Sequence, residues 1–169
     1  PWYAITDDLP QHAEYPPEFG TPATPRPVIE LKPGVAQGSC LCGEVAYEIS
    51  TPPLRMYLCH CSRCRKGRSA AHCANIFYNA EGFRWTRGAE LVQDFHLPSA
   101  QYFGTAFCRH CGSELPRVSF ARNMAVVPAG SLDSEPGIPP AGHIFVDSKA
   151  PWFEITGDVP QYAAMPPRS

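Results

Sequence analysis

The sequence has no long apolar run and no excess of charge of one sign. No stretch approaches the ~20 apolar residues that a membrane-spanning helix needs, and no basic segment followed by an apolar one marks a signal peptide. The formal net charge is −2, which gives no overall attraction for nucleic acid or a membrane surface. Paired carboxylates and a Ser-His-Asp arrangement are also missing as patterns. These absences predict no nucleic-acid or membrane partner, and the 169 residues are enough for one globular domain.

Cysteine, by contrast, is abundant, and its spacing favours metal binding. An even number of cysteines is compatible either with a disulfide framework or with metal sites. Two of the pairs are Cys-x-Cys, which would need strained rings to close as local disulfides, and the chain is longer than typical disulfide scaffolds. Metal binding predicts a reducing compartment, the cytoplasm. The eight cysteines are Cys40, Cys42, Cys59, Cys61, Cys64, Cys73, Cys108 and Cys111.

The two ends of the chain repeat each other. Residues 1–17 and 151–167 are identical at ten of seventeen aligned positions. We interpret 1–17 as a tail-like segment, either the end of a preceding similar domain or a second copy that docks on the same kind of surface, within the chain or in a homodimer. Residues 18–37 form a Pro-rich linker, residues 38–162 form the zinc-binding domain, and residues 163–169 form a C-terminal tail.

The body of the chain predicts a mainly antiparallel β domain. Within 43–49, Val45, Tyr47 and Ile49 alternate with Glu44, Ala46 and Glu48, as in a strand with one buried face. Residues 62–70 show no alternation and are compatible with a short helix. Further strands are expected at 73–78, 89–96, 101–107, 124–127 and 143–147.

Two short knuckles, one near each end of this region, predict a structural zinc site. Cys40 and Cys42 form one knuckle, and Cys108 and Cys111 form the other. A glycine follows each pair and lets backbone amides turn toward sulfur. Four thiolates make a closed tetrahedral site with no position left for a reacting ligand. Such a site would join the two ends of the long loop between the cysteine pairs. Metal binding would offset the entropy cost of closing this loop.

The motif CHCSRC contributes three more thiols, Cys59, Cys61 and Cys64. Three protein ligands with an exchangeable fourth position are typical of catalytic zinc, so we predict an open second zinc site. A closing histidine, His72 or His96, remains an alternative, and His110 is a further candidate. Cys73 is interpreted as a small buried residue because it lies in an apolar run. The ring of His60, between two ligands, should point away from their metal.

The sequence in and just after this motif is basic and contains Arg63, Arg65, Lys66 and Arg68. One interpretation is a solvated, charged turn. The other is that one or two of them, with Arg63 and Arg65 as the candidates, bind the carboxylates of a thiol peptide. No interleaved aromatic residues support a nucleic-acid groove.

Three motifs, GSCLCGEVAYEI, CHCSRCRK and FCRHCGSEL, resemble in order and spacing the glutathione-dependent formaldehyde-activating enzyme family, whose domain is shared with centromere protein V. The resemblance covers about 38–162. It implies an Mss4-like fold of coiled antiparallel β-sheets with two Zn²⁺ per chain. It places a structural zinc on the two knuckles and the second zinc on the middle motif. Lys66-Gly67-Arg68-Ser69-Ala70 is more basic than the usual family sequence, so the ligand can differ from glutathione.

The resemblance implies a carbon-sulfur lyase that joins a glutathione-like thiol and formaldehyde into S-hydroxymethylglutathione or a similar hemithioacetal. Zinc held by Cys59, Cys61 and Cys64 would activate the thiol, and His60 is the candidate general acid. The alternative hypothesis is a non-catalytic zinc-binding module or a glutathione-binding protein without turnover.

Overall fold

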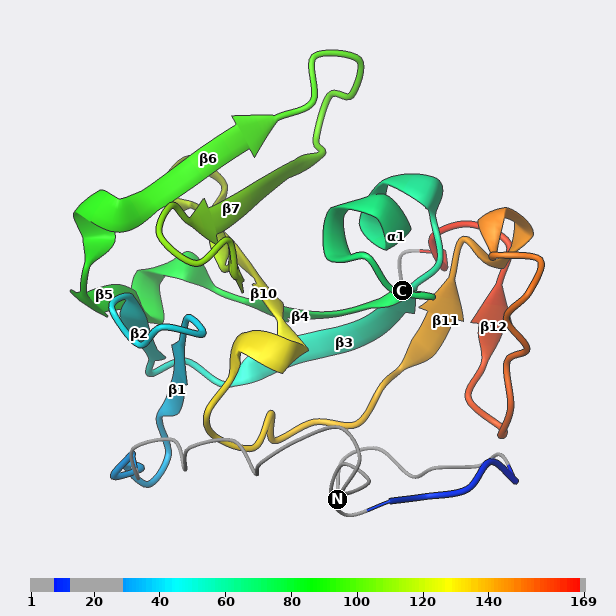
Figure 1. Cartoon of the computed structure of the whole chain (residues 1–169), viewed down its shortest axis with the longest axis horizontal. Helices are drawn as coiled ribbons and strands as arrows, with labels where there is room; N and C mark the ends of the chain where they lie inside the picture. Colours follow the sequence, from blue (N-terminus) through cyan, green and yellow to red (C-terminus); the bar gives the residue numbers. More distant parts are fainter. Residues whose placement is uncertain (1–7, 13–28, 168–169) are drawn as a thin grey trace, which may run out of the picture.

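A computed structural model describes residues 8–12 and 29–167, and the described part is mainly β (Figure 1). It contains twelve strands, one α-helix and five short 3-10 helices. The strands are β1 (Ala36–Ser39), β2 (Ala46–Ile49), β3 (Pro53–Cys59), β4 (Cys73–Tyr78), β5 (Phe83–Arg87), β6 (Val92–His96), β7 (Gly104–Cys108), β8 (Glu114–Leu115), β9 (Arg117–Ser119), β10 (Met124–Pro128), β11 (Gly142–Ile144) and β12 (Gln161–Tyr162). The helix is α1 (Ser62–Arg68), and the 3-10 helices are η2 (Ala80–Gly82), η3 (Ala89–Leu91), η4 (Phe120–Arg122), η5 (Ala129–Ser131) and η6 (Val146–Ser148).

The strands form three sheets, ordered β1-β2-β5, β12-β11-β3-β4-β10-β9 and β6-β7-β8. The pairs among β1 to β10 are antiparallel, which confirms the predicted class. β11 is different, because it pairs parallel with both β3 and β12. In Figure 1 helix α1 stands where β3 ends and β4 begins. The longest pair of strands therefore positions the residues on either side of the helix.

The predicted elements match the structure best where the sequence pattern is local. The helix expected within 62–70 is α1, and the strand expected at 73–78 is β4. The sequence did not predict β3 or β5. β3 begins with a proline, and burial along it does not alternate: its last four residues are all buried. β1 begins at Ala36, inside the range interpreted as linker.

A main hydrophobic core joins the three sheets. Its fully buried side chains include Tyr47, Ile49, Met56, Ile76 and Tyr78. Burying a large side chain of this kind contributes about 1.5–3 kcal/mol. The hydroxyl of Tyr47 forms a 2.7 Å hydrogen bond with the buried hydroxyl of Ser131 in η5. A smaller second core lies at the other end of β3, where Tyr57, Cys59 and Ile144 are buried together.

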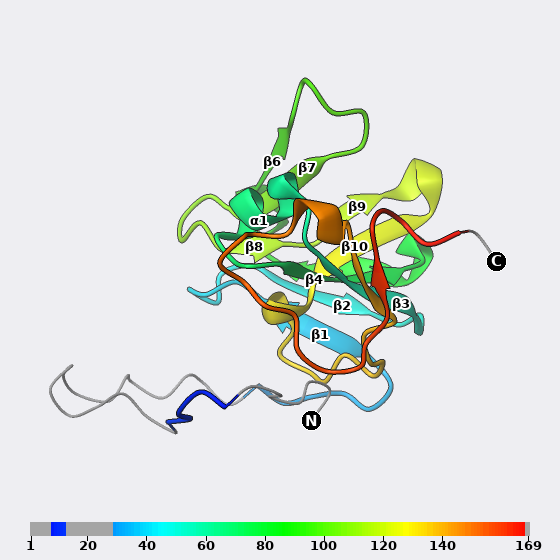
Figure 2. The ribbon, with the colours of Figure 1, turned by 90° about the vertical axis from the view of Figure 1, so that its right-hand side faces the viewer.

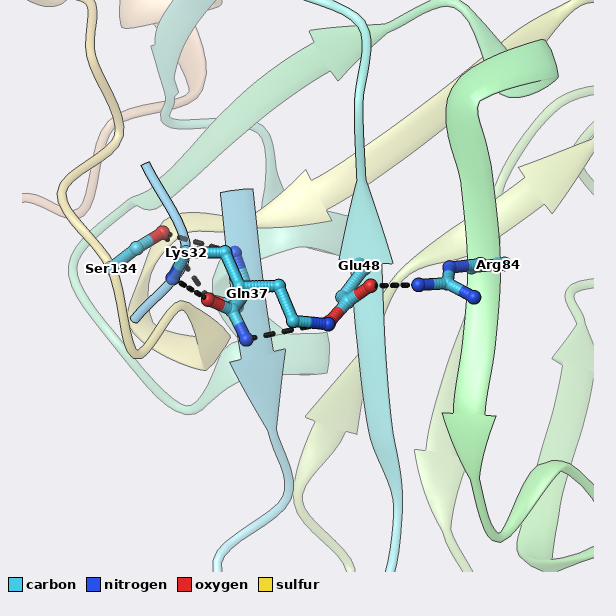
Figure 3. Close-up of polar contacts among 5 residues, drawn as sticks. All are labelled: Lys32, Gln37, Glu48, Arg84 and Ser134. Carbon is cyan, nitrogen blue, oxygen red and sulfur yellow. Dashed lines mark hydrogen bonds and ion pairs between the residues drawn. The ribbon is translucent and has the colours of Figure 1, made fainter. Parts of the chain in front are cut away.

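The strand alternation within 43–49 has one exception, Glu48. This residue was expected on the outer face with Glu44 and Ala46, yet it is only 6% exposed. Its carboxylate forms ion pairs with Lys32 and Arg84, one on each side (Figure 3). The hydrogen bond with Lys32, together with Arg84, holds the pKa of Glu48 below its usual value. The two cations make the burial of this carboxylate tolerable.

We expect Glu48→Gln to lower the melting temperature at neutral pH. Because the pKa of Glu48 is lowered in the folded state, its ion pairs stabilise the fold above the unfolded value of about 4.3. That stabilisation is lost as pH falls through the folded-state pKa. The difference in melting temperature between wild type and variant should therefore be present at pH 7 and vanish in acid. Glu44→Gln, at a half-exposed carboxylate, is the control, and equal melting temperatures at pH 7 would contradict the prediction.

The C-terminal segment folds back on the second core. After η6 the chain turns, and β12 lies beside β11 (Figure 1). Figure 2 shows this C-terminal segment in red. The backbone amide of His143 donates to the carbonyl of Pro160 at 2.7 Å, and Tyr162 packs against the second core. Of the repeated segment 1–17, only residues 8–12 are described. Its predicted docking surface or homodimer contact lies mostly outside the described residues and stays a prediction.

Among the described residues, no helix has the length and apolar character to cross a bilayer.

Candidate metal centres

The two predicted knuckles meet in space. Cys40 and Cys42 lie in the turn between β1 and β2, and Cys108 and Cys111 lie at the end of β7 and in the turn after it. Their four sulfurs are all within 4.8 Å of one another. The Sγ of Cys42 is 3.4 Å from that of Cys40 and 3.9 Å from that of Cys108. Zinc at 2.3 Å from each sulfur of a tetrahedron requires sulfurs about 3.8 Å apart. The donor set therefore fits a four-thiolate zinc.

Local backbone geometry explains how each knuckle forms. Gly43 and Gly112 have φ of 75° and 73°, in the left-handed region that glycine adopts most easily. Each donates its amide to the carbonyl of the first cysteine in its knuckle. The amide of Val45 then reaches the Sγ of Cys40 at 3.3 Å. In the first knuckle, the turn at Gly43 thus directs a backbone amide toward sulfur, as expected.

The knuckles are also linked through Ser113. Its hydroxyl accepts a hydrogen bond from the amide of Leu41 at 2.9 Å and lies 3.2 Å from the Sγ of Cys111. Burial disfavours the Cys111 thiolate, but hydrogen bonds from Ser113 and from Cys42 outweigh it and lower the pKa of Cys111 to about 6. Four close sulfurs accumulate negative charge when ionised, which a divalent cation would neutralise.

The second cluster is built at the junction of β3 and α1. Cys59 ends β3, Cys61 is the N-cap of α1, and Cys64 lies in its first turn. The amide of Cys64 donates to the Sγ of Cys61 at 3.4 Å, which satisfies one of the free amides of the helix start. The three sulfurs are all within 4.8 Å of one another. The Cys-x-x-Cys spacing places two ligands on one side of the helix start, and the strand end delivers the third.

The three sulfurs influence one another strongly. Hydrogen bonds with Cys59 and Cys64 lower the pKa of Cys61, whereas hydrogen bonds with Cys59 and Cys61 raise the pKa of Cys64. The directions of these shifts favour the thiolate at Cys61 and the protonated thiol at Cys64. All eight cysteines are free thiols, so the alternative of four disulfides is not what the structure shows. The set fits a metal with three protein ligands.

Among residues 8–12 and 29–167, no fourth histidine, cysteine or carboxylate joins the second cluster. His96 is exposed on β6, and the Nδ1 of His110 is 2.7 Å from a carboxylate oxygen of Glu44 at the surface. Cys73 is 4% exposed, as predicted, but its thiol also donates to the Oδ1 of Asn75 at 3.1 Å. The predicted open position is therefore compatible with the described structure.

Sequence reasoning missed a group of three histidines beside this cluster. His60 is fully buried, and its Nε2 lies 2.8 Å from the Nδ1 of His143 on β11. The ring of His72 is 5.2 Å from that of His60, and the ring of Phe153 is 5.9 Å from that of His60. The Nδ1 atoms of His60 and His72 have no hydrogen-bond partner in the described part of the chain. Only the parallel pairing of β11 with β3 brings His143 to this place, and no local pattern signals it.

Burial keeps these imidazoles neutral. It lowers the pKa of His60 to about 4, with further lowering by His72 and His143. Burial also lowers the pKa of His72, and that of His143 with a contribution from His72. His60 thus carries no extra proton at neutral pH. Its predicted role as general acid stays a prediction, and its ring faces the other histidines.

A cleft of about 580 Å³ is lined by Cys40 of the first cluster and by Cys73, the register partner of Cys59 of the second. Its walls are the first knuckle, the C-terminal end of α1, the start of β4 with His72 and Cys73, the turn after β7, and η5. Arg68 and Glu114 form an ion pair in the wall, with side chains 16% and 20% exposed. Burial raises the pKa of Glu114, although Arg68 acts in the opposite direction. The volume is in the range of small-molecule sites.

The two arginines predicted to bind substrate lie elsewhere on α1. Arg63 is exposed. Arg65 is partly buried, donates from Nε to the carbonyl of His60 at 3.2 Å, and lines a smaller cavity of about 220 Å³ with Lys66 and Trp152. Of the basic residues after CHCSRC, it is Arg68 that lines the larger cleft.

Comparisons with known proteins identify one family for this chain. The model of a family described as glutathione-dependent formaldehyde-activating enzyme matches residues 35–148, a range that contains all eight cysteines. A crystal structure of a Rhodobacter sphaeroides protein is 25% identical and covers 62% of this chain and 97% of its own, with a TM-score of 0.49. Among curated proteins, no significant match was found.

Proposed function

Because the chain belongs to the glutathione-dependent formaldehyde-activating enzyme family, we propose that it is a zinc-dependent carbon-sulfur lyase. It would form or cleave the hemithioacetal of a glutathione-like thiol and formaldehyde or a similar aldehyde. The observation that carries this proposal is the second cluster. Three sulfurs lie together with no fourth ligand among the described residues, and Cys73, the register partner of Cys59, lines a cleft of small-molecule size.

We assign a structural zinc to Cys40, Cys42, Cys108 and Cys111, and a second zinc to Cys59, Cys61 and Cys64. The first set has four donors and leaves no position for a reacting ligand. When bound to the second set, zinc would lower the pKa of a substrate thiol and favour the nucleophilic thiolate.

The residues of the cleft would hold the substrate and move its proton. Arg68 offers a guanidinium to a carboxylate of the thiol substrate, and Arg63 and Arg65 remain candidates for a second carboxylate. As the S–C bond forms, the π bond of the aldehyde breaks and the thiol proton must end on the former carbonyl oxygen. His72 lines the cleft, and its Nδ1 has no partner among the described residues. We therefore assign this proton transfer to His72.

X-ray absorption of the zinc-loaded protein, with and without excess glutathione, tests the proposal. A closed and an open site together give an average of about 3.5 sulfurs per zinc, which should rise to about 4 when a thiol fills the open position. NMR measurement of hemithioacetal formation above the uncatalysed rate completes the test.

Each alternative gives a different result. An added sulfur without faster turnover indicates a glutathione-binding protein. An unchanged zinc shell without turnover indicates a non-catalytic zinc-binding module. Either result would overturn the proposed enzyme activity.

A further inference from the structure

One cysteine outside both clusters lies directly opposite a cluster residue. In the pairing of β3 with β4, Cys73 is the register partner of Cys59. Directly opposed residues of antiparallel strands have side chains on the same face and Cα atoms about 4.5–5.5 Å apart. This separation is within the range of about 4.4–6.8 Å that disulfides span. The backbone is therefore already positioned to join these two residues.

The surroundings of Cys73 give small molecules a route to its thiol. Cys73 lines the 580 Å³ cleft, although it is only 4% exposed. Its Sγ is not among the sulfurs of the second cluster, and it donates to Asn75 at 3.1 Å. A rotation about χ1 between staggered rotamers is the movement that would bring it toward Cys59. Cys73 thus remains a free thiol when the three cluster sulfurs hold a metal.

We propose that Cys73 is an oxidation site whose disulfide with Cys59 dismantles the second metal centre. A hydroperoxide in the cleft oxidises the Cys73 thiol to a sulfenic acid and is reduced, with hydrogen peroxide giving one water. The Cys59 thiolate then attacks the sulfenic sulfur, the S–S bond forms, and hydroxide leaves. The disulfide removes one of three protein ligands, and only Cys61 and Cys64 remain for the metal.

Thiols reverse the change. Two molecules of glutathione reduce the disulfide by exchange, regenerate both cysteines and leave as glutathione disulfide. The metal-release part of this inference rests on the proposed function, because it requires a metal at the second cluster. The cross-link itself follows from the strand register and does not.

Peptide mapping of the zinc-loaded full chain tests the inference. The protein is treated with one equivalent of hydrogen peroxide, its free thiols are alkylated, and it is digested with trypsin without reduction. Trypsin places Cys59 and Cys61 in residues 56–63, Cys64 in residues 64–65 and Cys73 in residues 69–84. We expect a cross-link between 56–63 and 69–84 that tandem fragmentation assigns to Cys59, release of one zinc per chain, and reversal of the cross-link by glutathione.

Cys73→Ser and Cys73→Ala are the test variants, and both should bind as much zinc as wild type before oxidation. We expect both to lose the cross-link and to release zinc at least tenfold more slowly. A Cys61–Cys64 disulfide in wild type, or zinc release at the same rate in both variants, would overturn the proposal. If the second zinc is missing before peroxide is added, the proposed function fails on its own, while the cross-link still decides this inference.

Discussion

Cys108→Ser is expected to lose the structural zinc and most of the folded protein. Cys108 is fully buried and belongs to the main core as well as to the first cluster. A structural zinc contributes on the order of 10 kcal/mol to folding, whereas whole domains are stable by only about 5–15 kcal/mol. Serine also leaves a buried hydroxyl where a metal-bound sulfur should be. We therefore expect a largely unfolded chain at 37 °C, with zinc content below one per chain.

Zinc analysis after dialysis and thermal unfolding followed by circular dichroism measure both effects. Cys73→Ser is the matched control, because Cys73 is also a buried cysteine but lies outside both clusters. It should keep two zincs and a melting temperature close to that of wild type. A Cys108→Ser protein with two zincs and an unchanged melting temperature would refute the structural assignment of the first cluster.

Cys61→Ser is expected to remove the second zinc and catalysis while the fold persists. Cys61 caps α1 by accepting a hydrogen bond from the amide of Cys64, and a serine hydroxyl is among the preferred caps. The helix start should therefore survive. With only two sulfurs left, the site should lose its metal, and thiol activation with it. We expect hemithioacetal formation above background to fall on the order of a hundredfold or more.

Zinc content, circular dichroism and the NMR assay together separate this result from simple unfolding. The expected protein has one zinc, a wild-type spectrum and little activity. Ser62→Ala, at the adjacent exposed position, should retain both zincs and full activity. Two bound zincs in Cys61→Ser would show that the metal is held by other residues.

The sequence predicted the class of fold and the two clusters because both depend on short-range patterns. Glycine-terminated knuckles and the CHCSRC spacing fix sulfur positions within a few residues. The meeting of the two knuckles was inferred from zinc chemistry, which requires four ligands, and not from any strand pattern. β4 was predicted within its correct bounds because it is a compact apolar run.

Features that depend on distant contacts were not predictable in this way. Glu48 is buried because Lys32 and Arg84, from segments on either side of β2, neutralise it. The ion pair of Arg68 with Glu114 joins residues 46 positions apart in the chain. Arg68 was recognised as basic, but no sequence pattern placed it, in preference to Arg63, in the cleft. Such pairings are set by the tertiary arrangement of the sheets.

The parallel pairing of β11 with β3 also means that the second cluster gains its neighbouring strand only well after its own cysteines have been synthesised. The ligands of the second centre are encoded within residues 59–64, so they leave the ribosome together and early. The strands that pack beside them, β11 and β12, are made only after all the cysteines of both clusters. The first cluster is completed later. Cys40 and Cys42 are synthesised before the second cluster, but Cys108 and Cys111 are synthesised after it. The three cysteines of the second cluster are therefore available to a metal ion before β11 and β12 pack beside them.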